Sequence, residues 1–378
     1  MSILTEDQKL IQASVREFAV KEVAPIAAEI DKKHSFPTKT VNRMKELGFL
    51  GLSLPEEYEG SGSDYLSYIL AIEELSRVCA SHGVVISCHV SLGTSPIVAY
   101  GTAEQKKKYL PDLCSGRKLA AFALTEAGAG TDAASQKSVA VLEGDHYKLN
   151  GAKVFITNGA VAETFIYFAM TDASKGLKGI SAFIVEKGFK GFAVGQVEDK
   201  LGICASSTTE IILKDCIVPK ANLLGKEGEG FKIAMQTLDG GRIGIAAQAL
   251  GIAQGSLDAA VAYAKERVQF GKPISANQGI QWMLADMSAR TEAARQLTYY
   301  AAELKQSGAR YTKEAATAKL VAAEAAMFVS TQAVQVLGGI GYTRSYPVER
   351  YMRDAKITEI YEGTSQVQRM VIAGNLLA

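Results

Sequence analysis

The spacing of hydrophobic and polar positions divides the chain into three parts. In residues 1–118, apolar side chains recur at helical spacing, which predicts a mainly helical segment. Its first helix begins at Thr5, where Gln8 completes a capping box. A second predicted helix has Pro37 as its first residue and ends about ten residues later. A further apolar helix is predicted at about residues 83–98.

From Leu119 onward, the helical spacing gives way to short apolar runs separated by turns, such as 143–145 and 150–151. The runs that we interpret as strands are 119–124, 138–141, 147–149, 153–156, 165–168, 180–185 and 210–213. Regular strands without helices between them favour an antiparallel barrel or sandwich over a Rossmann sheet.

Long helical patterns return in residues 227–378. They cover 231–267, with an interruption near 239–241, and then 278–305 and 313–337. Alanine and leucine dominate these segments, which favours a helix bundle. The sequence therefore predicts an α+β multidomain fold in the order α, β, α.

The composition is that of a globular protein with 378 residues, of which 48% are hydrophobic and 21% are charged. Lys plus Arg (41) nearly balances Asp plus Glu (40), so there is no electrostatic footprint for nucleic acid. The apolar stretches look short or interrupted by charge, and we predict no transmembrane helix and no membrane insertion. Residues Met1–Leu4 lack the pattern of a targeting segment, which predicts a cytoplasmic, bacterial location.

The residues that most often hold metals or form disulfides show no suitable spacing. The cysteines are odd in number and indicate buried thiols in a reducing compartment: Cys79, Cys88, Cys114, Cys204 and Cys216. The histidines show no ligand pattern either: His34, His82, His89 and His146. We therefore predict no metal site.

Two glycine-rich segments could bring backbone close to a ligand. Gly128–Ala133 matches the dinucleotide pattern G-x-G-x-x-A, but a strand-like run follows where the pattern requires a helix, which excludes a Rossmann site. The loop Thr125–Thr131 could still offer N–H groups and hydroxyls to a phosphate or polar ring, and an ordinary turn is the alternative. Residues 335–341 end a helix in glycines, either as a plain cap or as a ligand contact.

Two further segments combine aromatic and polar residues. Phe155 and Thr157 share one face of a strand and could meet a flat ligand, or the strand simply ends at an Asn-Gly turn. Arg267 could hold a pyrophosphate while Phe270 stacks on a ring. Alternatively, Arg267 complements a helix dipole and Gly271 is the helix cap.

An acidic turn lies near the C-terminus, where Glu362 stands within Tyr361–Gly363. Ser365 and Gln368 fit a capping box, so a helix is predicted to begin near Thr364. A carboxylate beside an aromatic ring at a helix start could be a base with a shifted pKa. A solvated carboxylate that complements the helix dipole is the alternative.

In this order and at these separations, the segments resemble the acyl-CoA dehydrogenase family over the whole chain, and they look most like its short-chain (butyryl-CoA) members. The blocks that carry the resemblance are Leu124-Thr125-Glu126 with Gly128–Asp132, Phe155–Gly159, Arg267 with Phe270-Gly271, Gln335–Gly339, and Arg353-Asp354-Ala355 with Tyr361–Thr364.

The resemblance implies a helical N-terminal domain (1–118), a middle antiparallel β-barrel domain (119–226) and a C-terminal four-helix bundle (227–378). The assembly would be a homotetramer, as a dimer of dimers, with FAD between the β domain and the bundle. The flavin ring would meet Leu124, Thr125, Phe155 and Thr157. Other implied cofactor contacts are Phe122, Gly130, Thr131, Gln278, Val336, Thr364 and Gln366. The residues that would reach a neighbouring subunit's cofactor are Arg267, Gln269, Phe270, Gln335, Gly338 and Gly339.

The activity implied by the resemblance is α,β-dehydrogenation of a short-chain acyl-CoA to trans-2-enoyl-CoA. Glu362 would take the α-proton while a hydride passes from the β-carbon to flavin N5. The Glu362 backbone N–H, together with a flavin ribityl hydroxyl, would stabilise the thioester oxygen, and Gly363 and the following helix start fit this arrangement. Implied substrate contacts are Thr131, Asp239, Arg242, Tyr361 and Gly363. Electrons would pass to an electron-transferring flavoprotein.

Departures from the family pattern refine this expectation. Residues 240–241 are glycines where some branches carry the base, which supports the straight-chain arrangement. Phe155 replaces the Trp of many relatives, and residues 81–87 lack the Arg of glutaryl-type relatives. For the pair Asp239–Arg242, a surface salt bridge is the alternative to a substrate contact. For His89, a core role is favoured over a place in the acyl pocket.

Other functions share parts of this pattern. The same site could work as an enoyl-CoA reductase in an anaerobe, could accept a branched or cyclic acyl-CoA, or could pass electrons to oxygen. A non-enzymatic alternative is an acyl-CoA-binding protein that lacks FAD. The presence of Glu362 together with all the flavin-contact blocks argues against this last alternative.

Overall fold

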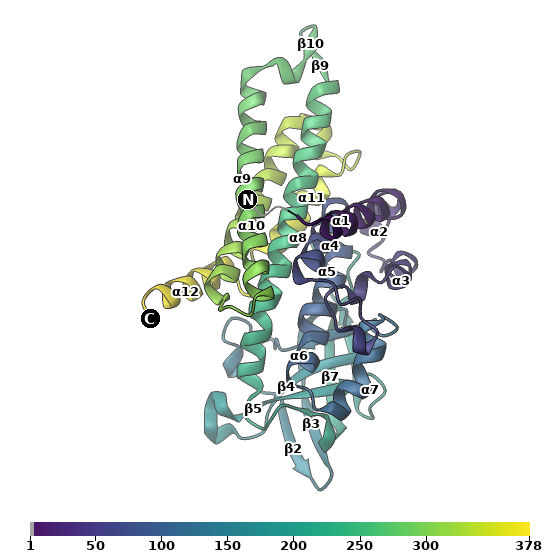
Figure 1. Ribbon diagram of the computed structural model, residues 1–378, viewed down its shortest axis with the longest axis vertical. Coiled ribbons are helices and arrows are strands. Elements are labelled where there is room, and N and C mark those ends of the chain that lie inside the picture. Colours follow the sequence, from purple (N-terminus) through teal and green to yellow (C-terminus); the bar gives the residue numbers. More distant parts are fainter. Residues whose placement is uncertain (1–3) are drawn as a thin grey trace.

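The computed structural model describes residues 4–378 (Figure 1). The first part is helical, as predicted, with α1 Glu6–Phe18, α2 Ala24–Lys33, α3 Thr38–Glu46, α4 Tyr65–Val78, α5 Ala80–Ser87, α6 Ser95–Tyr100 and α7 Ala103–Cys114. The capping box of α1 is confirmed, because Thr5 Oγ1 accepts from Gln8 N and Thr5 N donates to Gln8 Oε1. The prediction made for Met1–Ile3 lies outside the described residues.

Several helix boundaries differ from the predictions. The helix predicted at 83–98 is part of a longer helical run, in which π-helical residues Cys88–Thr94 separate α5 from α6. Pro37 is the N-cap of α3 and not its first residue, because its carbonyl already accepts a hydrogen bond from Val41 N at 3.0 Å. Helix α2 has no counterpart among the predicted helices.

The middle part forms one eight-stranded sheet. Its strands are β1 Ala120–Ala123, β2 Val139–Glu143, β3 His146–Thr157, β4 Thr164–Met170, β5 Ile180–Glu186, β6 Phe192–Val197, β7 Thr208–Pro219 and β8 Leu223–Leu224. Their order is β6-β7-β3-β2-β4-β5-β8, with β1 paired to β4.

The pairing supports a middle β domain but not a closed antiparallel barrel. Strand β1 runs parallel to β4, and within residues 4–378 no pairing joins the outer strands β6 and β8. Strand β1 comes directly from the helical part and lies beside a strand more than 40 positions later, with the register Ala120 to Thr164. Alternation along a sequence identifies strands, but it does not reveal such partners.

Strand β3 corrects two predictions. The runs 147–149 and 153–156 belong to this single strand, and Asn150-Gly151 is a bulge within it and not a turn. A Cβ on Gly151 would overlap the side chain of Ser138, which explains the glycine. Strands β6 and β8 have no counterpart among the predicted strands.

The last part is a helix bundle, as predicted, with α8 Gly230–Glu266, α9 Gln278–Gln306, α10 Thr312–Leu337, α11 Val348–Thr358 and α12 Ser365–Leu376. Helices α8, α9 and α10 pack against one another, and α11 packs on α8 and α10. The predicted interruption at 239–241 is wrong, because α8 is continuous. Cβ atoms on Gly240 and Gly241 would meet Lys305 Nζ and the Glu362 carboxylate, so close packing explains these glycines.

A hairpin connects α8 to α9. Strand β9 Val268–Gln269 pairs with β10 Lys272–Pro273. Phe270 and Gly271 form the turn, with φ angles of 51° and 76°. The interpretation of Gly271 as a helix cap is therefore wrong, since α8 has already ended at Glu266.

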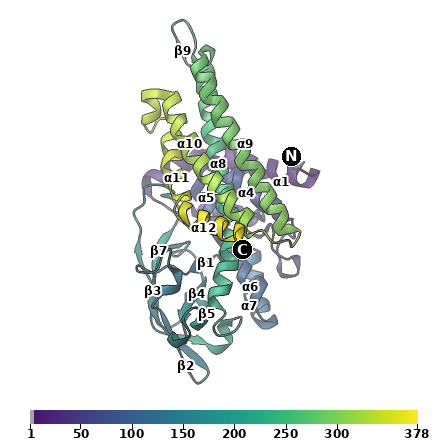
Figure 2. The ribbon, with the colours of Figure 1, turned by 90° about the vertical axis from the view of Figure 1, so that its left-hand side faces the viewer.

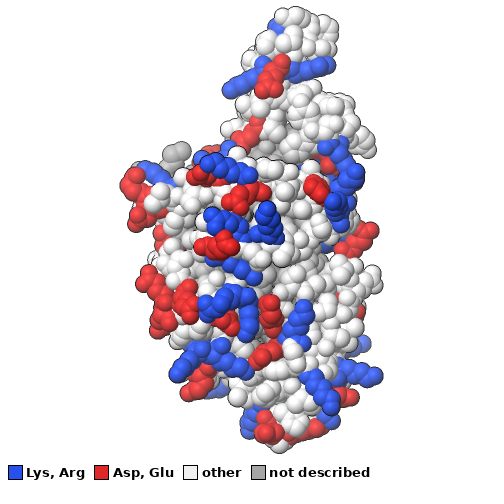
Figure 3. Space-filling view, turned by 90° about the vertical axis from the view of Figure 1, so that its right-hand side faces the viewer, with Lys and Arg blue, Asp and Glu red and all other residues white. Residues whose placement is uncertain are grey.

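The long helix α8 joins the two ends of the molecule. Figures 1 and 2 show the sheet at one end and the β9–β10 hairpin at the other. Helices α4 and α5 pack on α8 between these ends. On the face in Figure 3, acidic and basic side chains are interspersed, which agrees with the balanced composition.

Two helical stretches, Ala80–Tyr100 and Thr312–Tyr342, are long and apolar enough to cross a membrane by length and composition. These two stretches are therefore longer and more apolar than the sequence analysis judged, and the absence of a transmembrane helix stays a prediction. In the fold, 78% and 50% of their most apolar windows are buried. Helices in the core of a folded protein have the same character, so this test alone is weak evidence for a membrane span.

Candidate functional site

A strained turn presents Glu362 between α11 and α12. Glu362 and Gly363 have φ angles of 53° and 92°, and such backbone persists at a non-glycine residue only where its surroundings hold it. Gln368 Nε2 donates to the carbonyls of Glu362 (3.2 Å) and Gly363 (2.8 Å). Lys319 Nζ on α10 donates to the Gly363 carbonyl at 2.7 Å. Three hydrogen bonds to these two carbonyl groups thus fix the turn.

The predicted capping box at Ser365 and Gln368 is wrong. Thr364 is the N-cap of α12, and its Oγ1 accepts from Val367 N at 3.2 Å. Ser365 N donates to Glu359 O at 2.9 Å, and Ser365 Oγ has no partner among residues 4–378, so neither half of a box at Ser365 forms.

The Glu362 carboxylate has an unusual environment for a charged group. Its Oε2 is buried and has no hydrogen-bond partner among residues 4–378. Burial raises the pKa of Glu362 to about 7, against the lowering effect of the positive charges on Lys319 and Arg242. A Cβ on Gly241 would overlap Oε2, so the glycine makes room for the carboxylate. Because Oε2 is shielded from solvent, the alternative of a fully solvated carboxylate does not hold.

The predicted substrate pair Asp239–Arg242 lies beside this carboxylate on α8. Arg242 Nη1 donates to Asp239 Oδ1 at 2.6 Å, and Thr312 Oγ1 donates to Asp239 Oδ2 at 2.7 Å. Both charged side chains are largely buried, at 7% and 16% exposure, so a surface salt bridge is excluded. Arg242 Nε is buried without a partner among residues 4–378, which leaves a donor for a ligand.

Of the other three predicted substrate residues, two lie in the site and one lies in a loop. The Tyr361 hydroxyl donates to Gln248 Oε1 on α8, which holds the ring beside Glu362. Gly363 belongs to the same turn. Thr131 instead lies exposed in the glycine-rich loop of the β domain. The structure therefore brings Asp239, Arg242, Tyr361 and Gly363 together around Glu362, but records no contact between this group and Thr131.

The residues predicted to meet the flavin ring lie where β1 and β3 end. Thr125 O accepts from Val154 N at 2.9 Å, which joins the two strand ends. Phe155 has a φ of 58°, and its ring is 62% exposed. Thr157 O accepts from the Cys88 thiol at 3.6 Å, which places this strand end against the helical layer. The Phe122 ring, in contrast, packs edge-on to Phe168 in the core.

A buried lysine holds the glycine-rich loop against this strand end. Lys153 Nζ donates to Leu124 O (3.1 Å), Glu126 Oε1 (2.8 Å) and Gln136 Oε1 (3.0 Å). The Glu126 carboxylate also accepts from the backbone N–H groups of residues 137 and 138 at 2.6 and 2.9 Å. Burial lowers the pKa of Lys153 to about 8, against the effect of its acidic partner.

The groups at these strand ends suit a flat, polar cofactor with phosphates. Within residues 4–378, the backbone N–H groups of Thr125, Gly130 and Thr131 make no hydrogen bond, nor do the hydroxyls of Thr125 and Thr157. Open space surrounds Gly130, where an added Cβ would meet nothing. Unpaired donors beside the exposed Phe155 ring match the needs of a flavin, which stacks and accepts hydrogen bonds.

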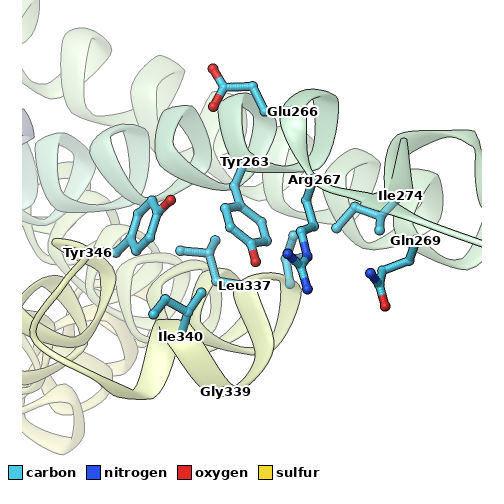
Figure 4. Close-up of a pocket in the computed structure, with 10 residues that line it drawn as sticks. Tyr263, Glu266, Arg267, Gln269, Ile274, Leu337, Gly339, Ile340 and Tyr346 are labelled. Carbon is cyan, nitrogen blue, oxygen red and sulfur yellow. The ribbon is translucent and has the colours of Figure 1, made fainter. Parts of the chain in front are cut away.

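A second group of predicted cofactor residues surrounds a cavity at the other end of α8 (Figure 4). The cavity has a volume of about 730 Å³ and is lined by Tyr263, Glu266, Arg267, Gln269, Ile274, Val336, Leu337, Gly339, Ile340 and Tyr346. Gly338 caps α10 with a φ of 66°, as one reading of the glycine-rich segment predicts.

Other residues of the second group lie near this cavity without lining it. Phe270 is 98% exposed in the hairpin turn. Gln335 and Gln278 are exposed, the first on the last turn of α10 and the second at the start of α9. All of these residues lie at the end of the molecule opposite the sheet (Figure 1). One chain therefore carries two separate sets of predicted cofactor contacts.

The remaining predicted contacts, Thr364 and Gln366, border a smaller cavity of about 320 Å³. Its other lining residues are Glu324, Lys356, Glu359, Ile360, Ser365 and Arg369. This cavity opens beside the start of α12, where backbone N–H groups favour a negative ligand.

Two further predictions concern buried groups. His89 is a core histidine, as favoured: its Nε2 lies 3.0 Å from Leu113 O, and its Nδ1 accepts from Ala120 N at 3.1 Å. All five cysteines are buried.

The Arg353-Asp354 block connects α11 to distant parts of the chain. Arg353 pairs with Asp31 at 2.7 Å, and Asp354 accepts from Ile203 N at 2.5 Å.

The sequence analysis missed several residues that shape the site: Lys153, Gln248, Lys319 and Gln368. A signal existed for Lys319, because it interrupts the buried alanine stripe of α10, and a lone charge on an apolar face needs a partner. Lys153 is likewise a charged residue among strand positions. No local pattern marks Gln248, and the pattern at Gln368 predicted a helix cap and not its contact with the Glu362 turn.

Family models identify the class of protein that this fold and site define. The acyl-CoA dehydrogenase N-terminal domain matches residues 5–117, the middle domain matches 121–216 and the C-terminal domain matches 228–377. The chain belongs to the acyl-CoA dehydrogenase family, whose members bind FAD.

Individual relatives narrow the comparison. A protein named "Acyl-CoA dehydrogenase, short-chain specific" from Clostridium acetobutylicum is 61% identical, over 99% of this chain and 98% of the relative. The acryloyl-CoA reductase (NADH) of Anaerotignum propionicum is 50% identical, over 99% and 95%.

Two solved structures are also similar. Butyryl-CoA dehydrogenase from Megasphaera elsdenii has a TM-score of 0.99 and 51% identity, with full coverage of both chains (100% each). A chain described with the electron transferring flavoprotein of Acidaminococcus fermentans has a TM-score of 0.99 and 58% identity, again over 100% of each chain.

Proposed function

We propose that this protein oxidises a short-chain acyl-CoA to the trans-2-enoyl-CoA, with Glu362 as the base that removes the α-proton. The single observation that carries the proposal is the buried, unpartnered Oε2 of Glu362 in the space left by Gly241. A carboxylate with a pKa of about 7 is ionised in a useful fraction near neutral pH, and it is a stronger base than an ordinary glutamate.

The residues around Glu362 would position the substrate. The thioester oxygen gains negative charge as the α-proton leaves, so the Glu362 N–H and the nearby start of α12 favour this charge. Arg242, with its unpartnered Nε, and Asp239 would contact the polar part of the substrate. Tyr361, held by Gln248, would close the side of the site.

The cofactor would lie against the ends of β1 and β3. Thr125, Phe155, Thr157 and the loop at Gly130 and Thr131 would hold the flavin ring and its ribityl chain, while Leu124 packs beneath it. Thr364 and Gln366 would contact the same cofactor from the start of α12. FAD, when bound, supplies the acceptor for the β-hydride.

The second set of contacts would serve a second copy of the chain. It comprises Arg267, Gln269, Phe270, Gln278, Gln335, Val336, Gly338 and Gly339. These residues belong to the β9–β10 hairpin and to the ends of α8, α9 and α10 beside it, at the opposite end of the molecule from the sheet (Figure 1), so one chain cannot apply both sets to one cofactor. We therefore propose a homotetramer, built as a dimer of dimers.

The domain limits that we propose are 1–118, 119–226 and 227–378, and the matched family domains support them. We further propose a cytoplasmic, bacterial location and an electron-transferring flavoprotein as the electron acceptor. The similar chain described with the Acidaminococcus fermentans flavoprotein supports this partner.

Reduction of an enoyl-CoA is a second candidate function. It is favoured by the 50% identity with an acryloyl-CoA reductase, and a catalyst accelerates both directions of a reaction. The direction would depend on the electron partner, since the same Glu362 would return the proton to the α-carbon.

The test is product analysis. Purified FAD-loaded protein is incubated with butyryl-CoA and a dye acceptor, and the acyl-CoA species are measured by mass spectrometry. We expect loss of two mass units with the wild type and none with Glu362→Gln. Longer, branched and dicarboxylic thioesters define the acyl range. Turnover of none of the saturated thioesters contradicts the proposal.

A further inference from the structure

Lys319 is a charged residue in an apolar environment. Its side chain is fully buried on α10, among alanines of the same helix face: Ala315, Ala316, Ala322, Ala323 and Ala326. Burying an unpaired ammonium costs free energy, so the groups that Lys319 contacts indicate what its charge does.

The ammonium meets the backbone of the Glu362 turn. Lys319 Nζ donates to the Gly363 carbonyl at 2.7 Å, the shortest of the three contacts that fix the turn. Burial lowers the pKa of Lys319 to about 8, against the raising effect of the Glu362 carboxylate. The positive charge of Lys319 in turn lowers the pKa of Glu362, against the raising effect of burial. The two groups are therefore coupled through a backbone hydrogen bond and through space.

Other groups face Glu362 from every element packed around it. Arg242 on α8 adds a second positive charge. The remaining neighbours are ordinarily neutral: Tyr65 and Tyr68 on α4, Cys88 on the π-helical segment, and Tyr361. Glu359 acts on Lys319 from the end of α11. Lys319 and Arg242 are thus the two charges that favour the ionised base.

We propose that Lys319 is a positioning residue for the base: it fixes the Gly363 carbonyl, and with it the strained Glu362 turn, and its charge keeps the Glu362 carboxylate ionised near neutral pH. This inference rests on the proposed function of Glu362. The two contributions are separable, because an arginine at position 319 keeps the charge, whereas a methionine keeps only the bulk.

The test is the pH dependence of flavin bleaching by butyryl-CoA in anaerobic holoenzyme. In Lys319→Met, we expect the acid limb of the profile to move up by about one pH unit or more, as for loss of a nearby opposite charge. The rate at pH 6.5 then falls about tenfold, and the difference shrinks toward pH 9. Lys319→Arg restores the wild-type midpoint. Lys313→Met, a half-exposed lysine on the same helix, leaves the profile unchanged.

A second readout needs no turnover. Infrared difference titration of substrate-free holoenzyme, measured against Glu362→Gln, follows the carboxylic-acid band of Glu362, and its midpoint should rise in Lys319→Met. If the methionine variant does not fold, Lys319→Gln replaces it, since its amide is neutral and can still donate a hydrogen bond.

The outcomes distinguish the role of Lys319 from the role of Glu362 as the base. An unmoved midpoint in the neutral variants overturns the effect of the Lys319 charge on Glu362, even if Glu362→Gln is inactive. A wild-type rate at every pH in Lys319→Met overturns both contributions of Lys319. Bleaching by Glu362→Gln at the wild-type rate overturns the base itself, whatever the Lys319 variants do.

Discussion

Gly241 of α8 lies so close to Glu362 that a Cβ on this residue would overlap the carboxylate Oε2. The same Cβ would also lie 2.8 Å from Leu92 Cδ2, so a side chain at this position would meet a second neighbour. A small residue on one helix thus determines where a base from another segment can stand. Glycine is poor in a helix interior, at a cost of about 1 kcal/mol, which packing must offset here.

Gly241→Ala should therefore raise helix propensity and lower activity. The added methyl displaces the carboxylate from its position, and we expect the rate of substrate oxidation to fall by about 10- to 100-fold. The measurement is the anaerobic rate of flavin bleaching, with thermal unfolding alongside. Gly279→Ala is the control, because Gly279 lies in α9, where an added Cβ would meet nothing. Full activity in Gly241→Ala would show that the carboxylate does not use this space.

The raised pKa of Glu362 predicts how stability depends on pH. The folded state binds this proton more tightly than the unfolded state, with a pKa of about 7 against 4.5. The proton's contribution to stability is complete below pH 4.5 and is lost as the pH rises through about 7.

Glu362→Gln cannot titrate at this position, so it isolates the effect. Between pH 4.5 and 7, wild type should lose about 1 to 3 kcal/mol of unfolding free energy relative to the variant. The difference should be level above pH 8. Denaturant unfolding at several pH values measures it. A difference that does not vary with pH would mean that Glu362 has an ordinary pKa.

The Lys153 network predicts a link between a buried ion pair and cofactor affinity. Lys153→Met leaves the Glu126 carboxylate buried without its cation, which typically costs about 3 to 5 kcal/mol. The loop carrying Gly130 should loosen, and the dissociation constant for FAD should rise more than tenfold. Fluorescence titration with FAD and denaturant unfolding measure the two effects.

Two variants check this prediction. Lys148→Met removes a half-exposed lysine that pairs with Glu143 on the same sheet, and it should leave FAD affinity unchanged. In the double variant Lys153→Met/Glu126→Gln, the uncompensated charge is gone, so part of the stability should return. Unchanged FAD binding in Lys153→Met would mean that the loop is held in another way.

The residues at the tip of the bundle predict that assembly and cofactor retention are coupled. Arg267→Gln changes an exposed residue at the cavity of about 730 Å³, at the opposite end of the molecule from the sheet. If this residue serves a second copy, the variant should lose FAD while its own strand ends are intact. Sedimentation and FAD content are measured together. A monomer that retains a full complement of FAD would contradict the shared site.

The sequence predicted the order of α, β and α segments because hydrophobic spacing is a local property. It also predicted the capping box at Thr5 and Gln8, which lies within four residues. The same rules failed at Asn150-Gly151, where turn residues form a bulge against Ser138, and at Gly240 and Gly241, where packing keeps a helix intact. Tertiary contacts decided these cases, and a single sequence does not display them.

In the candidate site, too, local features could be predicted from the sequence and contacts between distant segments could not. The acidic turn at Glu362 was visible in the sequence, and so was the pair Asp239–Arg242. The group that fixes the turn was not, because Lys319 and Gln368 reach it from other helices. The division of the cofactor contacts between two copies of the chain came from the family resemblance and not from residue spacing, since it depends on the length and direction of α8.

The central claim is that Glu362 is the base of a flavin-dependent acyl-CoA dehydrogenase. Its most direct test is the anaerobic visible spectrum of the purified holoenzyme before and after addition of butyryl-CoA, for wild type and Glu362→Gln. We predict that the flavin absorbance of the wild type bleaches and that of the variant does not. A flavin that ignores every saturated thioester, or a variant that bleaches like the wild type, would contradict the account.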